Sequence, residues 1–260
     1  MRILPICNQS NSNYKTQKNS TQFKAWDREV FRTPKDAFIK ELKHRNDTSF
    51  FRDGAFWNSL TYYLLYKYNQ TPKVNMYNYG CSDGSEIYSF LMALISRYGI
   101  ENAEKFTPIS AMDYDPVAIE KAKSKTYNIK SYEYTMINAL TTNKADMFLD
   151  YDINETQITA FPTEILTSRV NFKVANILHD YKKIKPQNSI VMARNFWPYL
   201  KEDAITLAKK LGSQMGENST LILGNYDIKG CEWNNINIEK HLINNGFQKS
   251  PIDLIFDKKS

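Results

Sequence analysis

The stretch VNMYNYGCSDGSEIYSFLMAL, residues 74–94, decides the fold that we expect for this chain. Val74 to Tyr79 is a short run of the type that forms β-strands, and it stops at Gly80. A stripe of apolar side chains at helical spacing then runs from Ile87 to Tyr98. The stretch therefore predicts a strand, a glycine loop and a helix.

The same order of elements follows a second time. Residues 107–112 are predicted to form a strand, Asp115 to cap the next helix, and Pro116 to be its first residue. Strands that alternate with helices form parallel sheets covered on both faces. We therefore expect an α/β fold that continues with strands at 170–174, 189–193 and 219–223, helices at 201–215 and 238–244, and a terminal hairpin of 247–249 and 254–256.

The chain is expected to divide into three parts. Asn8 to Gln22 is almost wholly polar, so residues 1–22 are predicted to be a disordered tail. Residues 23–70 are predicted to be an N-terminal helical region, in which apolar side chains recur at helical spacing from Trp57 to Tyr68. Residues 71–260 are the main domain. Within it, the rhythm of strands and helices breaks at 127–170, which predicts an inserted β-subdomain with short strands around 152–158 and 165–172.

Composition excludes several classes of protein. With 42% hydrophobic and 24% charged residues, the 260-residue chain is predicted to be globular. It has no run of about 18 apolar residues of the kind that a membrane helix needs, and its first residues lack the pattern of a signal peptide. We therefore expect a cytoplasmic protein without membrane insertion. Three cysteines without CxxC spacing indicate neither disulfides nor zinc, and the net charge of +6 comes without a dense basic block, so we expect no metal and no nucleic acid partner.

In an open α/β sheet, ligands bind outside the carboxyl ends of the strands. The first such end is the loop from Gly80 to Glu86, whose glycines let the backbone approach a ligand, although a glycine turn is common between any strand and helix. The second is Asp113, which can accept hydrogen bonds from both hydroxyls of a ribose or can simply face solvent. Together the two ends favour an adenosine ligand, either NAD or S-adenosylmethionine.

Two further strand ends carry polar residues. Asn176 and Ile177 follow the strand expected at 170–174, and Arg194 and Asn195 follow the strand expected at 189–193. Taken alone, each pair is explained as well by contact with solvent as by a ligand.

Five strings, in this order and spacing, resemble consecutive motifs of the CheR-type chemotaxis receptor (protein-glutamate) O-methyltransferases: DTSFFRD (47–53), GCSDGSEIYSFLMAL (80–94), AMDYDPVAIEKAKSKTY (111–127), VNFKVANIL (170–178) and ARNFWPYL (193–200). LGNYD (223–227) is similar to the LG-S-E strand of that family. Each motif is weak by itself, but five in register are a strong signal, and the resemblance covers about residues 36 to 260.

The resemblance implies a class I S-adenosylmethionine methyltransferase fold, with a Rossmann-like sheet, and S-adenosylmethionine as the cofactor, which leaves as S-adenosylhomocysteine. It places Arg52 and Tyr199 beside the transferred methyl group as catalytic residues. It also implies that the inserted subdomain docks a protein substrate, such as the helical cytoplasmic region of a chemoreceptor, and we expect a monomer. The cofactor contacts that it implies come from Asn46, Thr48, Arg52, Gly80, Glu86, Asp113, Asn176, Ile177, Arg194 and Asn195.

This sequence also departs from the family pattern. Residues 84–89 read GSEIYS where the family usually has GEEPYS, and residues 194–200 read RNFWPYL instead of RNVLIYF. The N-terminal helical region is shorter than the family's N-terminal domain. Three alternatives therefore stay open: a methyltransferase of the same fold that acts on another protein, one that acts on a small carboxylic acid, and a non-catalytic adaptor that binds the cofactor. A Rossmann oxidoreductase is disfavoured because the loop lacks the third glycine of GxGxxG.

The chemistry implied by the resemblance needs no general base. A glutamate carboxylate is ionised at neutral pH, so it can accept a methyl group without losing a proton. The matched motifs contain no catalytic histidine or acid dyad, and the three histidines share no ligand spacing. Arg52 and Tyr199 are therefore expected to orient the acceptor carboxylate.

Overall fold

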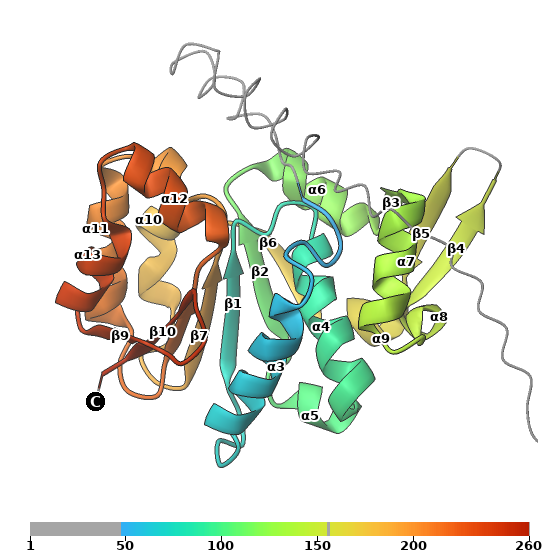
Figure 1. The fold of residues 1–260 in the computed structure, drawn as a ribbon, viewed down its shortest axis with the longest axis horizontal. Coiled ribbons are helices and arrows are strands. Elements are labelled where there is room, and N and C mark those ends of the chain that lie inside the picture. Colours follow the sequence, from blue (N-terminus) through green and yellow to red (C-terminus); the bar gives the residue numbers. More distant parts are fainter. Residues whose placement is uncertain (1–47, 155–156, 260) are drawn as a thin grey trace, which may run out of the picture. The chain divides into compact units, whose positions relative to one another are not determined.

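The computed structural model describes residues 48–154 and 157–259, and these contain a seven-stranded sheet in the order β6-β2-β1-β7-β8-β10-β9 (Figure 1). The first five strands in this order are mutually parallel, whereas β10 is antiparallel to both of its neighbours. This arrangement confirms the predicted α/β sheet and its terminal hairpin. The strands are β1 (Asn75–Tyr79), β2 (Ile109–Asp113), β6 (Val170–Val174), β7 (Ser189–Ala193), β8 (Thr220–Ile222), β9 (Phe247–Lys249) and β10 (Ile255–Lys258).

Helices cover both faces of this sheet. One face packs against α3 and α4, and the other packs against α11 and α13, which lie on the opposite side in Figure 1. Side chains alternate along the buried strands, so that Met192 faces the first core and Val191 the second. The helices outside the second sheet are α3 (Phe56–Lys67), α4 (Ser85–Tyr98), α5 (Ile100–Glu104), α6 (Pro116–Ser124), α10 (Ile177–Asp180), α11 (Asp203–Gln214), α12 (Asn225–Trp233) and α13 (Ile238–Asn244), with 3-10 turns η1 (Tyr181–Lys183) and η2 (Trp197–Leu200).

Local sequence signals explain where several helices begin. The Asp115 side chain accepts a hydrogen bond from the backbone N–H of Val117, and Pro116 is the first residue of α6, as predicted. Helix α4 is buried from Ser85 to Ser96, and its apolar side chains share one core with those of α3, the main sheet and the second sheet. The LGNYD stretch, which we compared with a strand, lies instead at the corner between β8 and α12.

A second, antiparallel sheet has the strand order β3-β5-β4. The expected strand around 152–158 is wrong, because β4 ends at Ile153 and β5 begins at Ile158, and these two isoleucines are cross-strand partners. The segment 165–172 is also not one strand, since it contains the end of a helix and the start of β6 of the main sheet. The elements are β3 (Tyr127–Ile129), α7 (Ser131–Leu140), α8 (Ala145–Phe148), β4 (Leu149–Ile153), β5 (Ile158–Pro162) and α9 (Glu164–Thr167).

The second sheet shares its core with the main sheet. The Tyr127 hydroxyl donates a 2.6 Å hydrogen bond to the backbone carbonyl of Asp83 in the first loop, and the Tyr127 ring lies edge-on to Phe50, with centroids 5.0 Å apart. Phe148 and Leu149 are buried in the same cluster as α4. Removing residues 127–170 would therefore expose part of the main core.

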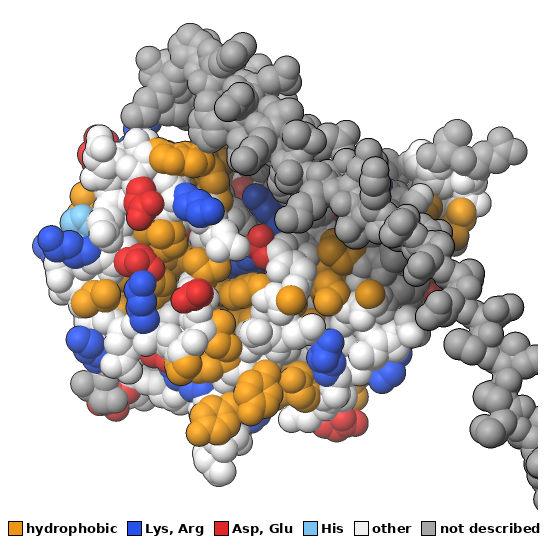
Figure 2. Space-filling view, viewed as in Figure 1, with side chains coloured by type: hydrophobic (Ala, Val, Ile, Leu, Met, Phe, Trp, Pro, Cys, Tyr) orange, Lys and Arg blue, Asp and Glu red, His pale blue; other side chains and the backbone are white. Residues whose placement is uncertain are grey.

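The surface of the described residues shows no large region of one charge in the view of Figure 2, where acidic and basic side chains are interspersed. Two exposed tyrosines, Tyr62 and Tyr66, lie on the outer face of α3. Among the helices of the described segments, none is long and apolar enough to span a membrane. The same segments contain no cluster of three or more His, Cys, Asp or Glu side chains that could hold a metal ion.

Candidate active site

The first loop, between β1 and α4, depends on two glycines. Gly80 has φ +71°, and a Cβ atom added there would lie 2.7 Å from the ring of Phe196. Gly84 has φ +86°, and its added Cβ would lie 2.6 Å from the ring of Phe172. Both positions therefore need glycine for backbone conformation and for space, which lets the loop turn tightly over the carboxyl end of β1.

Asp113 joins this loop to the end of β2. Its carboxylate accepts hydrogen bonds from the backbone N–H of Ser82, at 2.9 Å, and of Asp115, at 3.0 Å, and only 5% of the residue is exposed. Burial raises the pKa of Asp113, while these N–H groups act to lower it. Each carboxylate oxygen has a second lone pair, so the group fits the predicted ribose contact.

Replacing Asp113 with alanine is expected to weaken S-adenosylhomocysteine binding by about ten- to a hundred-fold. Hydrogen bonds to a charged acceptor contribute about 1.5–3 kcal/mol. Isothermal titration calorimetry would measure the loss. Asp115→Ala is the matched control, since Asp115 caps α6 and should affect stability more than affinity. Equal affinities of wild type and Asp113→Ala would remove Asp113 from the cofactor site.

Asn176 and Ile177 lie after β6, at the start of α10. The Asn176 side-chain oxygen accepts a 3.0 Å hydrogen bond from the N–H of Leu178 and so caps the helix. Its own backbone N–H donates to Asp180, at 2.9 Å. Ile177 is buried in the second core. The cap thus fixes this corner at the same edge of the sheet as Asp113, where the predicted adenosine contact requires it.

Arg194, at the end of β7, is completely buried beneath α3. Its guanidinium forms ion pairs with Glu86, at 2.8 Å, and with Asp53, and its Nε donates to the carbonyl of Leu223. The rings of Phe56 and Trp57 lie 4.8 and 5.0 Å from the guanidinium carbon. All of these contacts are with protein groups, so Arg194 ties the loop before α3, the helix α4 and strands β7 and β8 together. A direct contact with the cofactor stays a prediction.

The Glu86 carboxylate is buried beside Arg194 and is stabilised by nearby positive charges. Burial raises its pKa, and the nearby charges of Arg194 and Arg52 act to lower it. Asn78, a fully buried residue of β1, also acts to lower the pKa of Glu86. Neither polar atom of the Asn78 side chain has a hydrogen-bond partner of ordinary geometry among the described residues. Glu86 and Arg194 were predicted as separate contacts of one ligand, and the structure joins them directly.

Arg52 lies near enough to Tyr199 for its positive charge to act on the pKa of that hydroxyl, and the catalytic roles of both residues stay predictions. Arg52 precedes α3, and Tyr199 lies in η2 with 37% of its surface exposed. Burial and the neighbouring Tyr226 raise the pKa of Tyr199, while the positive charge of Arg52 acts to lower it. Thr48, a predicted cofactor contact, lies beside the end of the glycine loop, because its hydroxyl oxygen is 3.0 Å from that of Ser85. Asn46 lies outside the described residues.

Asp227 is a site residue that sequence reasoning missed. It is fully buried, and its carboxylate accepts hydrogen bonds from the backbone N–H groups of Gly224 and Asn195, both at 2.7 Å, and of Trp197, at 3.0 Å. It therefore holds the β7 corner, including the predicted residue Asn195, against the β8 corner. Its position just after a strand, in LGNYD, was the available signal.

Asp227 should make stability depend on pH. Burial raises its folded-state pKa to about 7, against about 3.9 in an unfolded chain. Between these values only the folded protein holds the proton, so this group's contribution to the free energy of unfolding falls as pH rises from about 4 to 7, by at most about 1.4 kcal/mol per pH unit. Urea unfolding should show that wild type loses more stability than Asp227→Asn between pH 5 and pH 8, because the asparagine does not titrate. Parallel curves for the two proteins would refute the assignment.

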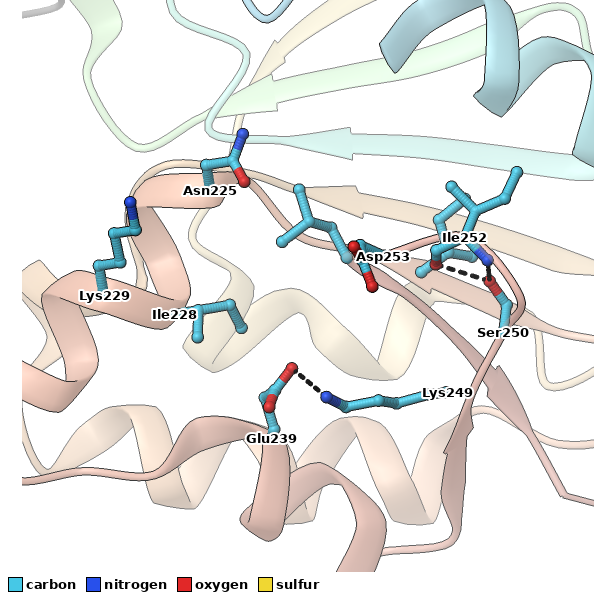
Figure 3. Close-up of a pocket in the computed structure, with 10 residues that line it drawn as sticks. Asn225, Ile228, Lys229, Glu239, Lys249, Ser250, Ile252 and Asp253 are labelled. Atoms are coloured by element: carbon cyan, nitrogen blue, oxygen red, sulfur yellow. Dashed lines mark hydrogen bonds and ion pairs between the residues drawn. The ribbon is translucent and has the colours of Figure 1, made fainter.

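A pocket of about 210 Å³ lies between α12, α13 and the turn that joins β9 to β10 (Figure 3). Asn225, Ile228 and Lys229 line it from α12, and Glu239 pairs across it with Lys249, at 2.8 Å. None of the site residues predicted from the sequence lines this pocket. Seven of the predicted residues lie at or after the carboxyl ends of β1, β2, β6 and β7, apart from this pocket: Gly80, Glu86, Asp113, Asn176, Ile177, Arg194 and Asn195.

Comparison with solved structures gives neighbours of low identity. One is the N-methyltransferase NodS from Bradyrhizobium japonicum WM9 in complex with S-adenosyl-L-homocysteine, which is 12% identical, covers 82% of this chain and 87% of that chain, and has a TM-score of 0.45. Another is an O-methyltransferase family protein from Burkholderia thailandensis, which is 12% identical, covers 92% and 69%, and has a TM-score of 0.45.

Comparison with protein families gives a match over most of the chain. The family described as "CheR methyltransferase, SAM binding domain" matches residues 46–236. The matched range includes the glycine loop and Asp113, whose geometry fits an adenosine cofactor, and it also includes Glu86, Arg194 and Asp227. The class I methyltransferase fold and the cofactor S-adenosylmethionine follow from this match and from the observed sheet. The chain therefore belongs to the CheR methyltransferase family.

Proposed function

We propose that this protein methylates carboxylates, and that its acceptor is a glutamate side chain of a protein, such as the helical cytoplasmic region of a chemoreceptor. The observation that carries the proposal is the kind of ionisable group beside Tyr199. Bound S-adenosylmethionine would supply an electrophilic methyl group, which a carboxylate oxygen can accept without any proton transfer while S-adenosylhomocysteine leaves.

Among the residues that the structure describes, the groups that act on Tyr199 and its neighbour Tyr226 do not include a base that an acceptor could reach. They are Arg52, which is a cation, Asp227 and Cys231. Burial raises the pKa of both tyrosines and raises that of Cys231 to about 12, so these groups keep their protons at neutral pH. The Asp227 carboxylate is buried and accepts three backbone N–H groups. An acceptor that is already an anion suits such a site best.

Arg52 would bind and orient the acceptor carboxylate. A guanidinium forms directed, charge-assisted hydrogen bonds with a carboxylate, and Tyr199 adds a hydroxyl donor. Holding the attacking oxygen in line with the methyl group lowers the entropic part of the barrier. The buried residues under α3 limit the access of water from the α3 side of the site. The net charge of +6 also favours an encounter with acidic proteins.

Transfer of labelled methyl groups into a cell lysate tests this function. With S-adenosylmethionine carrying a labelled methyl group, we expect label in the protein fraction that is released as methanol by mild base, because carboxyl methyl esters hydrolyse where N-methyl groups survive. Asp113→Ala is the matched control and should transfer little label. Base-stable label would refute carboxylate methylation, and base-labile label only in the small-molecule fraction would identify a small carboxylic acid as the acceptor.

A further inference from the structure

Three residues from distant parts of the chain lie near one another, and two of them, Arg52 and Tyr199, are the predicted catalytic residues. Arg52 comes from the loop before α3, Tyr199 from η2 and Tyr226 from the first turn of α12. The ring centroids of Tyr199 and Tyr226 are 5.8 Å apart, with the rings tilted by 40°. Trp233, which is about half exposed, lies edge-on to Tyr226, with ring centroids 5.9 Å apart. Tyr226 was not among the residues predicted from the sequence.

Close backbone contacts hold Tyr226 in this position. A Cβ atom added to Gly224 would lie 2.2 Å from the side-chain oxygen of Asn195, and one added to Gly230 would lie 2.4 Å from the Pro198 ring. Helix α12 therefore lies directly against the η2 turn that carries Tyr199. Asp227, the residue after Tyr226, hydrogen-bonds the N–H groups of that turn, as described above. The two tyrosines are consequently parts of one rigid unit.

The two hydroxyls also share one electrostatic environment. Burial raises the pKa of Tyr226, the hydroxyls of Tyr199 and Tyr226 each shift the pKa of the other, and the positive charge of Arg52 acts to lower both. Both tyrosines are partly exposed, whereas Trp197 and Pro198 of the same turn are buried. An acceptor that reaches Arg52 therefore meets two hydroxyls rather than one.

We infer that Tyr226 is a second hydroxyl of the acceptor site, and that Tyr199 and Tyr226 act as a pair that holds one oxygen of the acceptor carboxylate beside Arg52. A phenol carries a single hydroxyl proton. When one tyrosine donates its proton to the other, the pair presents one O–H to the acceptor. That bond goes to the carboxylate oxygen that does not attack, so the other oxygen keeps its lone pairs for the methyl group. This inference rests on the proposed function.

Single-turnover transfer from labelled S-adenosylmethionine into lysate protein tests the pair in four proteins: wild type, Tyr199→Phe, Tyr226→Phe and the double variant. A hydrogen bond to a charged acceptor contributes about ten- to a hundred-fold in rate when it acts in the transition state. We expect each single variant to be slower by about this factor, and the double variant to be no more than about two-fold slower than the slower single variant, because the residues act as a unit. S-adenosylhomocysteine affinity should change less than about two-fold, since neither hydroxyl is assigned to the cofactor.

A second measurement does not require turnover. N-acetylglutamate, as a carboxylate probe, should bind the S-adenosylhomocysteine complex of wild type, and binding should be weakened at least about five-fold in both single variants. Trp233→Phe is the aromatic control, because it alters the ring beside Tyr226 and leaves both hydroxyls in place, so it should behave as wild type.

Three results would overturn the inference. They are a wild-type rate for Tyr226→Phe while Tyr199→Phe is slow, multiplicative losses in the double variant, and a wild-type protein that neither transfers label nor binds the probe. The proposed function fails in a different way. If the label is transferred but is stable to base, the acceptor is not a carboxylate, whereas the ratios among the four proteins still report whether the tyrosines act together.

Discussion

Replacing Arg194 with methionine is expected to lower the free energy of unfolding by about 3–5 kcal/mol. Arg194 is fully buried and pairs with two carboxylates, Glu86 and Asp53. Methionine fills a similar volume but removes the cation that pairs with both acids, and Glu86 is itself buried. The unpaired charge then carries its full desolvation cost. Urea unfolding with linear extrapolation would measure the change.

Matched variants separate loss of the pair from loss of packing. Lys123→Met breaks an ion pair whose partners are both well exposed, Lys123 and Glu120, and should change stability by less than about 1 kcal/mol. Arg194→Met combined with Glu86→Gln should recover part of the loss, because the neutral amide costs less to bury. A destabilisation of Arg194→Met no larger than that of Lys123→Met would show that the buried pairs do not hold the site together.

Replacing Arg52 with alanine is expected to damage cofactor binding and methyl transfer together. The positive charge of Arg52 acts to lower the pKa of Glu86, a predicted cofactor contact. It also acts to lower the pKa values of Tyr199 and Tyr226, the two hydroxyls that we assign to the acceptor. Loss of a charge-assisted hydrogen bond costs about 1.5–3 kcal/mol, or about ten- to a hundred-fold, at each step where it acts. Calorimetry with S-adenosylhomocysteine and single-turnover transfer of labelled methyl groups would measure the two losses.

The matched comparison for Arg52 is Tyr199→Phe. Its hydroxyl is assigned to the acceptor, so turnover should fall and cofactor affinity should barely change. Arg52→Lys keeps the charge but loses the planar fork of donors, and should lie between wild type and Arg52→Ala. Wild-type turnover in both Arg52→Ala and Tyr199→Phe would show that the catalytic roles implied by the family do not apply to this chain.

The second sheet depends on the rest of the protein in a way that the sequence did not show. The loss of strand and helix rhythm after Tyr127 indicated an insertion, and a separate sheet begins there. The sequence did not show that the Tyr127 hydroxyl bonds to the first loop, or that Phe148 lies in the main core. A point variant on its surface is therefore a better test of docking than deletion of the segment.

The sequence by itself determined the elements whose signals are local. Strand β1, the glycine loop, the Asp115 cap of α6 and helix α13 were predicted within a few residues, because periodicity, caps and positive-φ glycines act over one or two turns of chain. The predicted strand ends also placed Asp113, Asn176 and Arg194 at one edge of the sheet, since parallel strands align their carboxyl ends.

Only the tertiary structure decided which of these residues contact one another. Arg194 meets Glu86 and Asp53, which are 108 and 141 positions away, and Asp227 bonds the N–H group of Asn195 across 32 positions. Such pairings leave no periodic trace in the sequence, because they arise from the order of strands in the sheet and from the need to neutralise charges that packing removes from water. For the same reason Tyr226, an ordinary helix residue in the sequence, lies beside Tyr199 only because α12 packs against η2.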